Sequence, residues 1–434
     1  MSNKRFILAS FLLVLLAILI PVEHKYDKLF RYYSLTLIPE GLKVSANYDK
    51  KIYFYISDLI VLALLCIVPI KRSVLWLLPL FALASIIASP FYAYPLPYIR
   101  LLQLFTPIAL FSIVSTAFSP NERSKITRYI LIAVVAGALF QSFVAIAQYL
   151  NQSPIGLRLL GESPLKSVFY IENGSRWLLD ALSNRPAHTP IVLRAQGTFS
   201  HPNILGGFLF FSLLATYALW MQAKKIRWLL ILALPIQFFA MSLSFSRSAL
   251  FAWALSTLLW FGLMAYRNRQ LPRIALLVLI SFSFSAALLY KQYVHRGGVI
   301  NYNALAKSSD DIRKFHQKTA LKIIKDHPFF GLGFTQFSER SDPYFPPDAP
   351  GHIRSTGPHN MFLFLACETG LLSVAALLFC LASRILLFFK QPLTVETITF
   401  ASLLLGFIFI GCCDFYPILF QQGRLLFFLI GALL

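Results

Sequence analysis

The sequence predicts an all-α integral membrane protein with about 12 transmembrane helices, because apolar residues dominate it and gather in blocks of membrane-spanning length. Of the 434 residues, 57% are hydrophobic and only 13% are charged. Soluble domains carry roughly 25% charged residues, so this chain has too few to cover a water-facing surface. The apolar blocks are roughly 16 to 24 residues long, which suits helices that cross a bilayer. We therefore expect residues 1–434 to form a single polytopic membrane domain.

The expected spans follow from these apolar runs. The first run comes after Lys4 and Arg5, as in a secretory signal, but no small-x-small cleavage site follows Ile20. Because further spans come after it, we expect this segment to remain as the first helix. The runs lie near residues 6–22, 53–70, 74–92, 98–118, 127–150, 203–221, 226–245, 248–266, 273–291, 360–389, 396–416 and 423–434.

Lysine and arginine in the short loops predict the orientation of the spans. With the N-terminus in the cytoplasm, the short outer connections hold only Arg100, Arg247 and Arg424. Basic residues of short loops stay in the cytoplasm, so this asymmetry places both the N- and the C-terminus there. The basic residues of the inner segments are Lys4, Arg5, Lys71, Arg72, Arg123, Lys125, Arg128, Lys224, Lys225, Arg227, Arg267, Arg269, Arg273, Arg384 and Lys390.

The net charge of +21 invites a nucleic-acid-binding interpretation, which the apolar blocks argue against. Basic loops beside membrane helices arise from orientation and from anionic headgroups, so we expect membrane lipids as partners and no nucleic acid. The five cysteines lie in apolar segments without a CxxC pair, which predicts neither a disulfide framework nor a zinc site. Asp310 and Asp311 suit a helix cap. Because HExxH, Walker and GxGxxG signatures are absent, we expect no metal and no cofactor.

Three long outer segments cover residues 23–52, 151–202 and 292–359. For the first segment, the sequence predicts only a loop that covers the bundle at the level of the lipid headgroups. The other two are large loops that carry most of the polar residues of the outer face. Long loops of this kind are usually functional. In the third segment, apolar residues recur at helical spacing over 312–324, and basic residues beginning with Arg313 fill the opposite face. This pattern predicts a basic amphipathic helix at the membrane surface, which either covers the bundle or binds anionic substrate.

Four polar side chains stand where expected spans begin at the outer face. Arg194, His201 and Asn203 lead into the sixth span and could be loop caps or site residues. Arg247 lies in a connection so short that it must stay at the outer surface. There it either snorkels to lipid headgroups or binds an anion.

His359 and Asn360 open the tenth expected span from the outside. The positive end of a helix dipole disfavours the imidazolium form, and a general base needs a neutral imidazole. Alternatively, both side chains only hydrogen-bond the start of the helix. Glu368 lies roughly 13 Å further along that helix. Because buried carboxylates in membranes are costly and usually paired, we interpret Glu368 as structural.

Four strings of the sequence, taken in order, carry a resemblance to a known family. They are RAQGTFSHPNILGGF, SLSFSRSALFAW, KIIKDHPFFGLGFTQF and PHNMFLFLACETGLL, within residues 190–375. Their order and spacing resemble the O-antigen ligase and polymerase superfamily of membrane-embedded C-type glycosyltransferases. The expected span layout, the large outer loop before the His-Asn helix and the string DFYPILFQQGRLLFF near the end are similar too.

The resemblance implies a glycosyltransferase of the bacterial inner membrane whose active site faces the periplasm. Such enzymes take a glycan from undecaprenyl diphosphate and pass it to an acceptor hydroxyl, without a metal or a nucleotide. Matching positions make His359 the base that activates the acceptor, while Arg194 and Arg247 bind the diphosphate. Arg313 matches an arginine that often begins the helix before the HPxxGxG string. The paired N–H donors of arginine side chains can balance the charge of a diphosphate leaving group. A single displacement would invert the anomeric centre.

These considerations give a set of expected site residues and leave the acceptor open. His359, Arg247 and Arg194 are expected to be catalytic, and the expected substrate-binding residues are Arg313, His201, Asn203 and Asn360. An O-antigen ligase would use lipid A-core as acceptor, and an O-antigen or exopolysaccharide polymerase would use another carrier-linked glycan; a protein-glycan ligase comes third. A lipid-linked sugar transporter would show repeated halves and charges near the bilayer midplane, whereas here the charges collect at the outer boundary.

Overall fold

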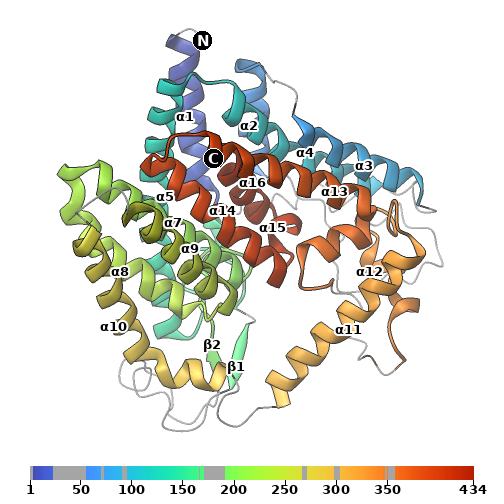
Figure 1. Ribbon diagram of the computed structural model, residues 1–434. Helices are drawn as coiled ribbons and strands as arrows, with labels where there is room; N and C mark the ends of the chain where they lie inside the picture. Colours follow the sequence, from blue (N-terminus) through green and yellow to red (C-terminus); the bar gives the residue numbers. More distant parts are fainter. Residues whose placement is uncertain are drawn as a thin grey trace.

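The computed structural model describes residues 3–22, 55–69, 73–89, 95–165, 167–170, 191–265, 271–297, 304–347, 349 and 357–434. These ranges form a helical bundle with one two-stranded sheet (Figure 1). The helices are α1 (Asn3–Leu19), α2 (Ile56–Ile67), α3 (Leu77–Ile87), α4 (Pro95–Thr116), α5 (Pro120–Asn151), α7 (Pro202–Gln222), α8 (Arg227–Leu243), α9 (Arg247–Ala265), α10 (Leu271–Gly297), α11 (Ala304–Asp326), α12 (Phe337–Arg340), α13 (Met361–Lys390), α14 (Val395–Cys413), α15 (Tyr416–Leu419) and α16 (Gln421–Leu433), and the strands are β1 (Val168–Tyr170) and β2 (Ile191–Leu193). Short 3-10 helices cover Val74–Trp76, Arg158–Leu160, Lys224–Ile226 and Asp342–Tyr344.

The prediction of an all-α membrane protein is confirmed, and every predicted span contains a helix. In the described part of the chain, eight helices are long and apolar enough to cross a membrane, namely α4, α5, α7, α8 with the turn before it, α9, α10, α13 and α14. The helices α1, α2, α3 and α16 have only 17, 12, 11 and 13 residues. Because about 20 residues are needed to cross the hydrocarbon layer, the expected total of about 12 spans stays a prediction.

The long outer segments are described only in part. The expected loop 23–52 lies outside the described residues, as do 171–190 of the second loop and 298–303 of the third. The end of the second loop carries the sheet, in which β1 and β2 pair antiparallel and Val168 faces Leu193. In Figure 1 this sheet and α11 occupy the same lower edge of the molecule, below the helical bundle. That edge is where the sequence predicts the outer face.

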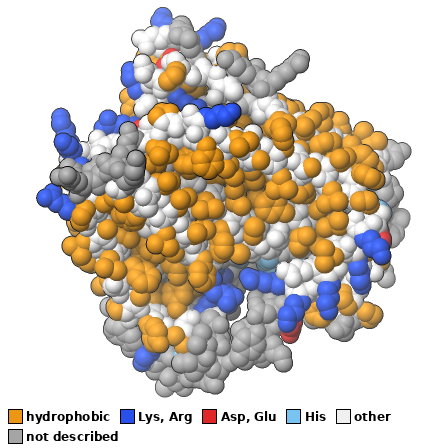
Figure 2. Space-filling model, in the orientation of Figure 1, with side chains coloured by type: hydrophobic (Ala, Val, Ile, Leu, Met, Phe, Trp, Pro, Cys, Tyr) orange, Lys and Arg blue, Asp and Glu red, His pale blue; other side chains and the backbone are white. Residues whose placement is uncertain are grey.

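The outer surface of the bundle is rich in exposed apolar side chains. Phe251, Leu258, Phe379 and Phe389 each expose more than 60% of their area. Figure 2 shows hydrophobic side chains spread over most of the visible face, with lysine and arginine gathered toward its margins. A soluble protein rarely exposes a continuous apolar surface of this size, whereas a bundle surrounded by lipid must do so. The surface therefore agrees with a multi-pass membrane protein.

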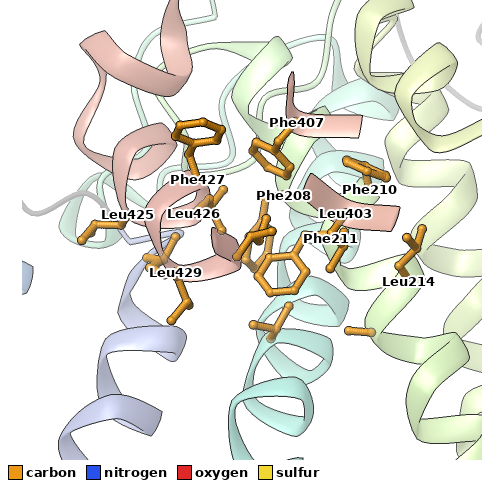
Figure 3. Packing of buried hydrophobic residues seen from close by; sticks show 14 of the residues in the cluster. Phe208, Phe210, Phe211, Leu214, Leu403, Phe407, Leu425, Leu426, Phe427 and Leu429 are labelled. Atoms are coloured by element: carbon orange, nitrogen blue, oxygen red, sulfur yellow. The ribbon is translucent and has the colours of Figure 1, made fainter. Parts of the chain in front are cut away.

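Helix α7 is the centre of the packing, because almost every one of its residues is buried. It contacts α5, α8, α9 and α14. Phe208, Phe210 and Phe211 of α7 meet Leu403 and Phe407 of α14 and the leucines of α16 (Figure 3). Buried aromatic rings contribute large contact areas to this packing. The N-terminal end of α7 is thereby held by its neighbours, and the site described below surrounds that end.

Small residues allow the helices around α7 to approach closely. A Cβ atom added at Gly206 would lie 2.8 Å from Cβ of Ala249 on α9, and one at Gly207 would collide with the ring of Tyr416 on α15. Gly406 of α14 meets the ring of Phe210 in the same way. Small residues at helix crossings are a common means of tight packing in membrane bundles.

The predicted basic amphipathic helix is present as α11. Its buried face carries His316, Thr319, Ala320 and Ile323, each of which has no exposed area. Its exposed face carries the basic residues Arg313, Lys314, Lys318, Lys322 and Lys325. Where α11 lies relative to a bilayer stays a prediction.

Candidate functional site

A chain of polar contacts joins four elements at the N-terminal end of α7. The Nη2 atom of Arg194, just after β2, donates to Oδ1 of Asn203 in the first turn of α7 at 2.6 Å. The Nδ2 atom of Asn203 donates to Oδ2 of Asp414 at 2.7 Å. The other carboxylate oxygen of Asp414 lies 3.9 Å from Nδ1 of His359. Three predicted site residues, Arg194, Asn203 and His359, are therefore connected through Asp414.

Asp414 is the residue that the sequence did not identify. It ends α14 and is buried, with only 6% of its area exposed. Burial raises the pKa of its carboxyl, but the hydrogen bond and charge of His359, together with His201 and Asn203, outweigh burial and hold this pKa below its ordinary value. Asp414 is therefore an ionised carboxylate at neutral pH. Its sequence signal was available, since it is the only acidic residue in DFYPILFQQGRLLFF.

His359 lies directly before α13 and is partly open to solvent, with 35% of its side chain exposed. Its ring contacts Phe415 at a centroid distance of 5.3 Å, while the buried His316 of α11 lies 6.1 Å away. The imidazole thus lies beside two aromatic rings, and its Nδ1 atom lies near the carboxylate of Asp414. An imidazole that is oriented by a carboxylate and remains accessible suits a general base.

His201 and Asn360 each cap the N-terminus of a helix that begins at the site. The Nδ1 atom of His201 accepts the backbone N–H of Asn203 at 3.1 Å and caps α7. Burial and the charge of Arg194 lower the pKa of His201 to about 4, so the ring is neutral at physiological pH. Oδ1 of Asn360 accepts the backbone N–H groups of Phe362 and Leu363, which caps α13. Both residues have a structural function here, and their predicted substrate-binding function stays a prediction.

Asn360 also ties the start of α13 to the end of α14. Its Nδ2 atom donates to the backbone carbonyl of Cys412 at 3.1 Å. Because Asp414 follows Cys412 by two residues, this bond keeps the backbone on either side of the His359–Asp414 pair at a constant separation.

The segment after α11 packs against α13 at the point where that helix is interrupted. Gly370 interrupts α13 with a φ of 80°, which leaves backbone groups on both sides available for bonding. The N–H of Leu332 donates to the carbonyl of Cys367 at 2.8 Å, and the N–H of Leu371 donates to the carbonyl of Pro328 at 2.8 Å. A Cβ atom at Gly331 would collide with the backbone of Cys367, so the glycine permits this approach. The HPFFGLG string therefore anchors α11 beside His359.

Glu368 completes this anchor. Its buried carboxylate accepts the backbone N–H of Phe337 at 2.8 Å and also the N–H of Thr335. The expected structural role of Glu368 therefore agrees with its contacts, although its partners are backbone amides rather than a basic side chain. Two strings of the sequence, HPFFGLG and ACETG, form a single structural unit.

Three further arginines, Arg247, Arg296 and Arg313, form a group with Arg194. Arg247 begins α9 after a tight turn in which Phe245 has a φ of 47°. Arg194 lies within electrostatic reach of Arg247 and of Arg296 at the end of α10. Arg296 in turn lies within reach of Arg247 and Arg313. Burial and the neighbouring positive charge of Arg296 lower the pKa of Arg194 to about 9, which still leaves it protonated at neutral pH.

Hydrogen bonds tie Arg194 and helix α10 to the turn before Arg247. The Nε atom of Arg194 donates to the carbonyl of Ser244 at 2.8 Å, so the loop after β2 is tied to the turn before Arg247. The Oη atom of Tyr293 donates to the carbonyl of Ser242 at 2.8 Å, which ties α10 to the same turn. The site thus combines a group of arginines, of which Arg194 is held by hydrogen bonds, with one buried carboxylate and one accessible histidine. In the described part of the chain, no group of three or more His, Cys, Asp or Glu side chains could hold a metal ion.

Comparison with known families finds a match over part of the chain. Residues 230–380 match a family model described as O-antigen ligase. The match supports the O-antigen ligase superfamily. The resemblance found in the sequence is thereby confirmed over a segment that includes Arg247, Arg313 and His359, while Arg194, Asn203 and Asp414 lie outside it. No curated protein matches the chain.

Proposed function

We propose that this protein is a glycosyltransferase of the O-antigen ligase type, which transfers a glycan from undecaprenyl diphosphate to an acceptor hydroxyl on the periplasmic face of the inner membrane. The observation that carries the proposal is the juxtaposition of an accessible histidine, oriented by a buried carboxylate, with a cluster of arginines. The same residues would serve a ligase and a polymerase. We favour the ligase, whose acceptor is lipid A-core.

The arginines provide the binding site for the leaving group. When the bond between the anomeric carbon and the diphosphate oxygen breaks, negative charge develops on the diphosphate. Guanidinium groups bind phosphate oxygens with paired N–H donors and remain charged at all physiological pH values. Arg194 is held by its bond to the carbonyl of Ser244, and Arg247 begins α9 after the same turn, so Arg194 needs little rearrangement when this charge appears.

His359 acts as the general base in this mechanism. It accepts the proton of the acceptor hydroxyl as the oxygen attacks the anomeric carbon from the side opposite the diphosphate. The new glycosidic bond forms as the old bond breaks, and the configuration at the anomeric carbon is inverted. The ionised carboxylate of Asp414 lies 3.9 Å from Nδ1 and would stabilise the imidazolium that forms. The proton then leaves His359 to solvent, and the diphosphate carrier is the second product.

The surface glycan of a deletion strain tests this proposal and separates the alternatives. Loss of polymer from lipid A, with the carrier-linked polymer retained, is the expected result for a ligase. Single repeat units on lipid A would instead indicate a polymerase. A glycoprotein defect with normal lipopolysaccharide would indicate a protein-glycan ligase. Retention of carrier-linked glycan on the cytoplasmic side would identify a transporter and contradict the proposal.

A further inference from the structure

Arg296, in the last turn of α10, is not among the residues that the sequence predicts for the site. Tyr293, one turn earlier on α10, donates to the carbonyl of Ser242, and its ring packs on Phe245 at a centroid distance of 5.1 Å. Residues three apart lie on the same face of a helix. Arg296 therefore lies on the face of α10 that is held against the turn before Arg247.

The surroundings of Arg296 are positively charged. The positive charges of Arg247 and Arg313 disfavour the protonated form of Arg296. The charge of Arg296 disfavours the protonated form of Arg194 in the same way. Asp414 is a carboxylate whose charge acts on Arg194. The four guanidinium groups repel one another, and this repulsion is unfavourable unless an anion is bound. A multiply charged anion would relieve it most.

Arg296 also has an unused hydrogen-bond donor. Its Nε atom is buried, and within the described residues it has no hydrogen-bond partner. A buried donor left without an acceptor is unfavourable, and the cost is larger for a charged group. The last turn of a helix favours a positive charge, so the dipole of α10 explains part of this placement. The dipole does not explain why the guanidinium group lies within electrostatic reach of two other arginines.

We propose that Arg296 binds the diphosphate and, together with Arg194, Arg247 and Arg313, makes the site selective for a polyprenyl diphosphate over a polyprenyl monophosphate. This inference rests on the proposed function. A monophosphate has too few oxygens, on a single phosphorus, to engage all four guanidinium groups, whereas the two linked phosphates of a diphosphate span more of them. The selectivity has a use in the reaction cycle, because the monophosphate carrier is then a poor competitor of the donor.

Binding measurements on the full-length protein in detergent test this inference. Undecaprenyl diphosphate and undecaprenyl monophosphate are the probes, each competing with radiolabelled undecaprenyl diphosphate. The wild-type protein should bind the diphosphate more tightly. Arg296→Gln should weaken diphosphate binding about 10-fold or more while changing monophosphate binding much less, because one charged hydrogen bond is lost. Arg273→Gln, at the opposite end of α10, is the matched control and should leave both affinities unchanged.

The outcomes separate the inference from the proposed function. If the wild-type protein binds undecaprenyl diphosphate and Arg296→Gln binds it equally well, or loses both probes in parallel, the inference is wrong and the proposed function is unaffected. If the wild-type protein binds neither probe, the proposed donor is wrong as well. Arg296→Lys keeps the charge and serves if the glutamine variant does not fold. It should still weaken diphosphate binding, because an ammonium group lacks the paired donors, but by less than glutamine does, because the positive charge remains.

Discussion

The Nδ1 atom of His359 lies 3.9 Å from Oδ1 of Asp414, across the junction between the start of α13 and the end of α14. Asn360 closes the same junction through its bond to the carbonyl of Cys412. The imidazole is therefore oriented by a group from a different helix, and only its partly exposed side can meet an acceptor.

We expect His359→Ala to abolish glycan transfer while the protein still accumulates in the membrane. Loss of a general base typically lowers the rate about 10²- to 10⁴-fold. The measurement is glycan display on the surface of a deletion strain that expresses the variant, with immunoblotting for the protein. Display near the wild-type level would reduce His359 to a structural residue at the start of α13.

Replacement of Asp414, the carboxylate beside His359, should lower the transfer rate through its effect on His359. Asp414→Asn keeps the size of the side chain but removes the charge that stabilises the imidazolium, and it should lower the transfer rate about 10-fold or more. Glu396→Gln, in the first turn of the same helix α14, is the control and should transfer normally. A positioning effect on a base should alter the dependence of the rate on pH. If Asp414→Asn keeps the rate and the pH profile of the wild-type protein, Asp414 does not act on His359.

A lysine variant of Arg247 distinguishes a need for positive charge from a need for the paired N–H donors of a guanidinium group. If Arg247 binds a diphosphate through these paired donors, Arg247→Lys keeps the charge but loses the paired bonds and should transfer glycan poorly. If Arg247 only snorkels to headgroups, lysine should serve about as well. Arg194→Lys is a second and independent variant for the same comparison, since Arg194 is buried whereas Arg247 is partly exposed.

Purified protein with carrier-linked glycan and acceptor provides the companion measurement. Excess EDTA should leave turnover undiminished if arginines neutralise the diphosphate. Full activity of both lysine variants, or a loss of activity in EDTA that an added divalent metal restores, would contradict the arginine mechanism.

His201 predicts a dependence of stability on pH. Its pKa is lowered to about 4 in the folded protein, whereas an unfolded histidine titrates near 6.5. Between these values the unfolded chain binds a proton that the folded chain does not, so stability falls as the pH falls from about 6.5 toward about 4. His201→Asn keeps a good cap without this titration, so its Tm in detergent should fall less than the wild-type Tm between pH 7 and pH 5. Equal falls in the two proteins would argue against a buried neutral His201.

Topology can be tested with single cysteines in a chain whose five native cysteines are replaced. Arg269→Cys, outside the described residues, should react with an impermeant reagent only after the inner membrane is opened. Asp342→Cys should react from the periplasm. These results follow from the asymmetry of lysine and arginine in the short loops. The reverse pattern would place the site in the cytoplasm.

Local patterns predicted much of the fold and part of the site. The apolar blocks indicated where helices form, and the spacing over 312–324 predicted α11, because both signals are contained within one helix. The sequence predicts the number of membrane spans less firmly than it predicts the positions of the helices. Four of the predicted segments form helices shorter than the usual crossing length, and α16 is buried along its whole length. Apolar composition alone does not distinguish a helix that faces lipid from one that fills the interior.

The sequence by itself determined the class of the protein, the helical segments, the strings that resemble the O-antigen ligase superfamily, and Arg194, Asn203 and His359 as candidates at the outer boundary. Only the tertiary structure decided that Asp414, 55 residues after His359, faces its imidazole, and that Arg296 joins the arginine group. The reason is physical. Helix formation and hydrophobic periodicity depend on neighbours within a few residues. The meeting of side chains from α7, α10, α13 and α14 depends on how the helices cross, which aromatic packing around α7 and the glycine contacts of Gly206 and Gly406 determine.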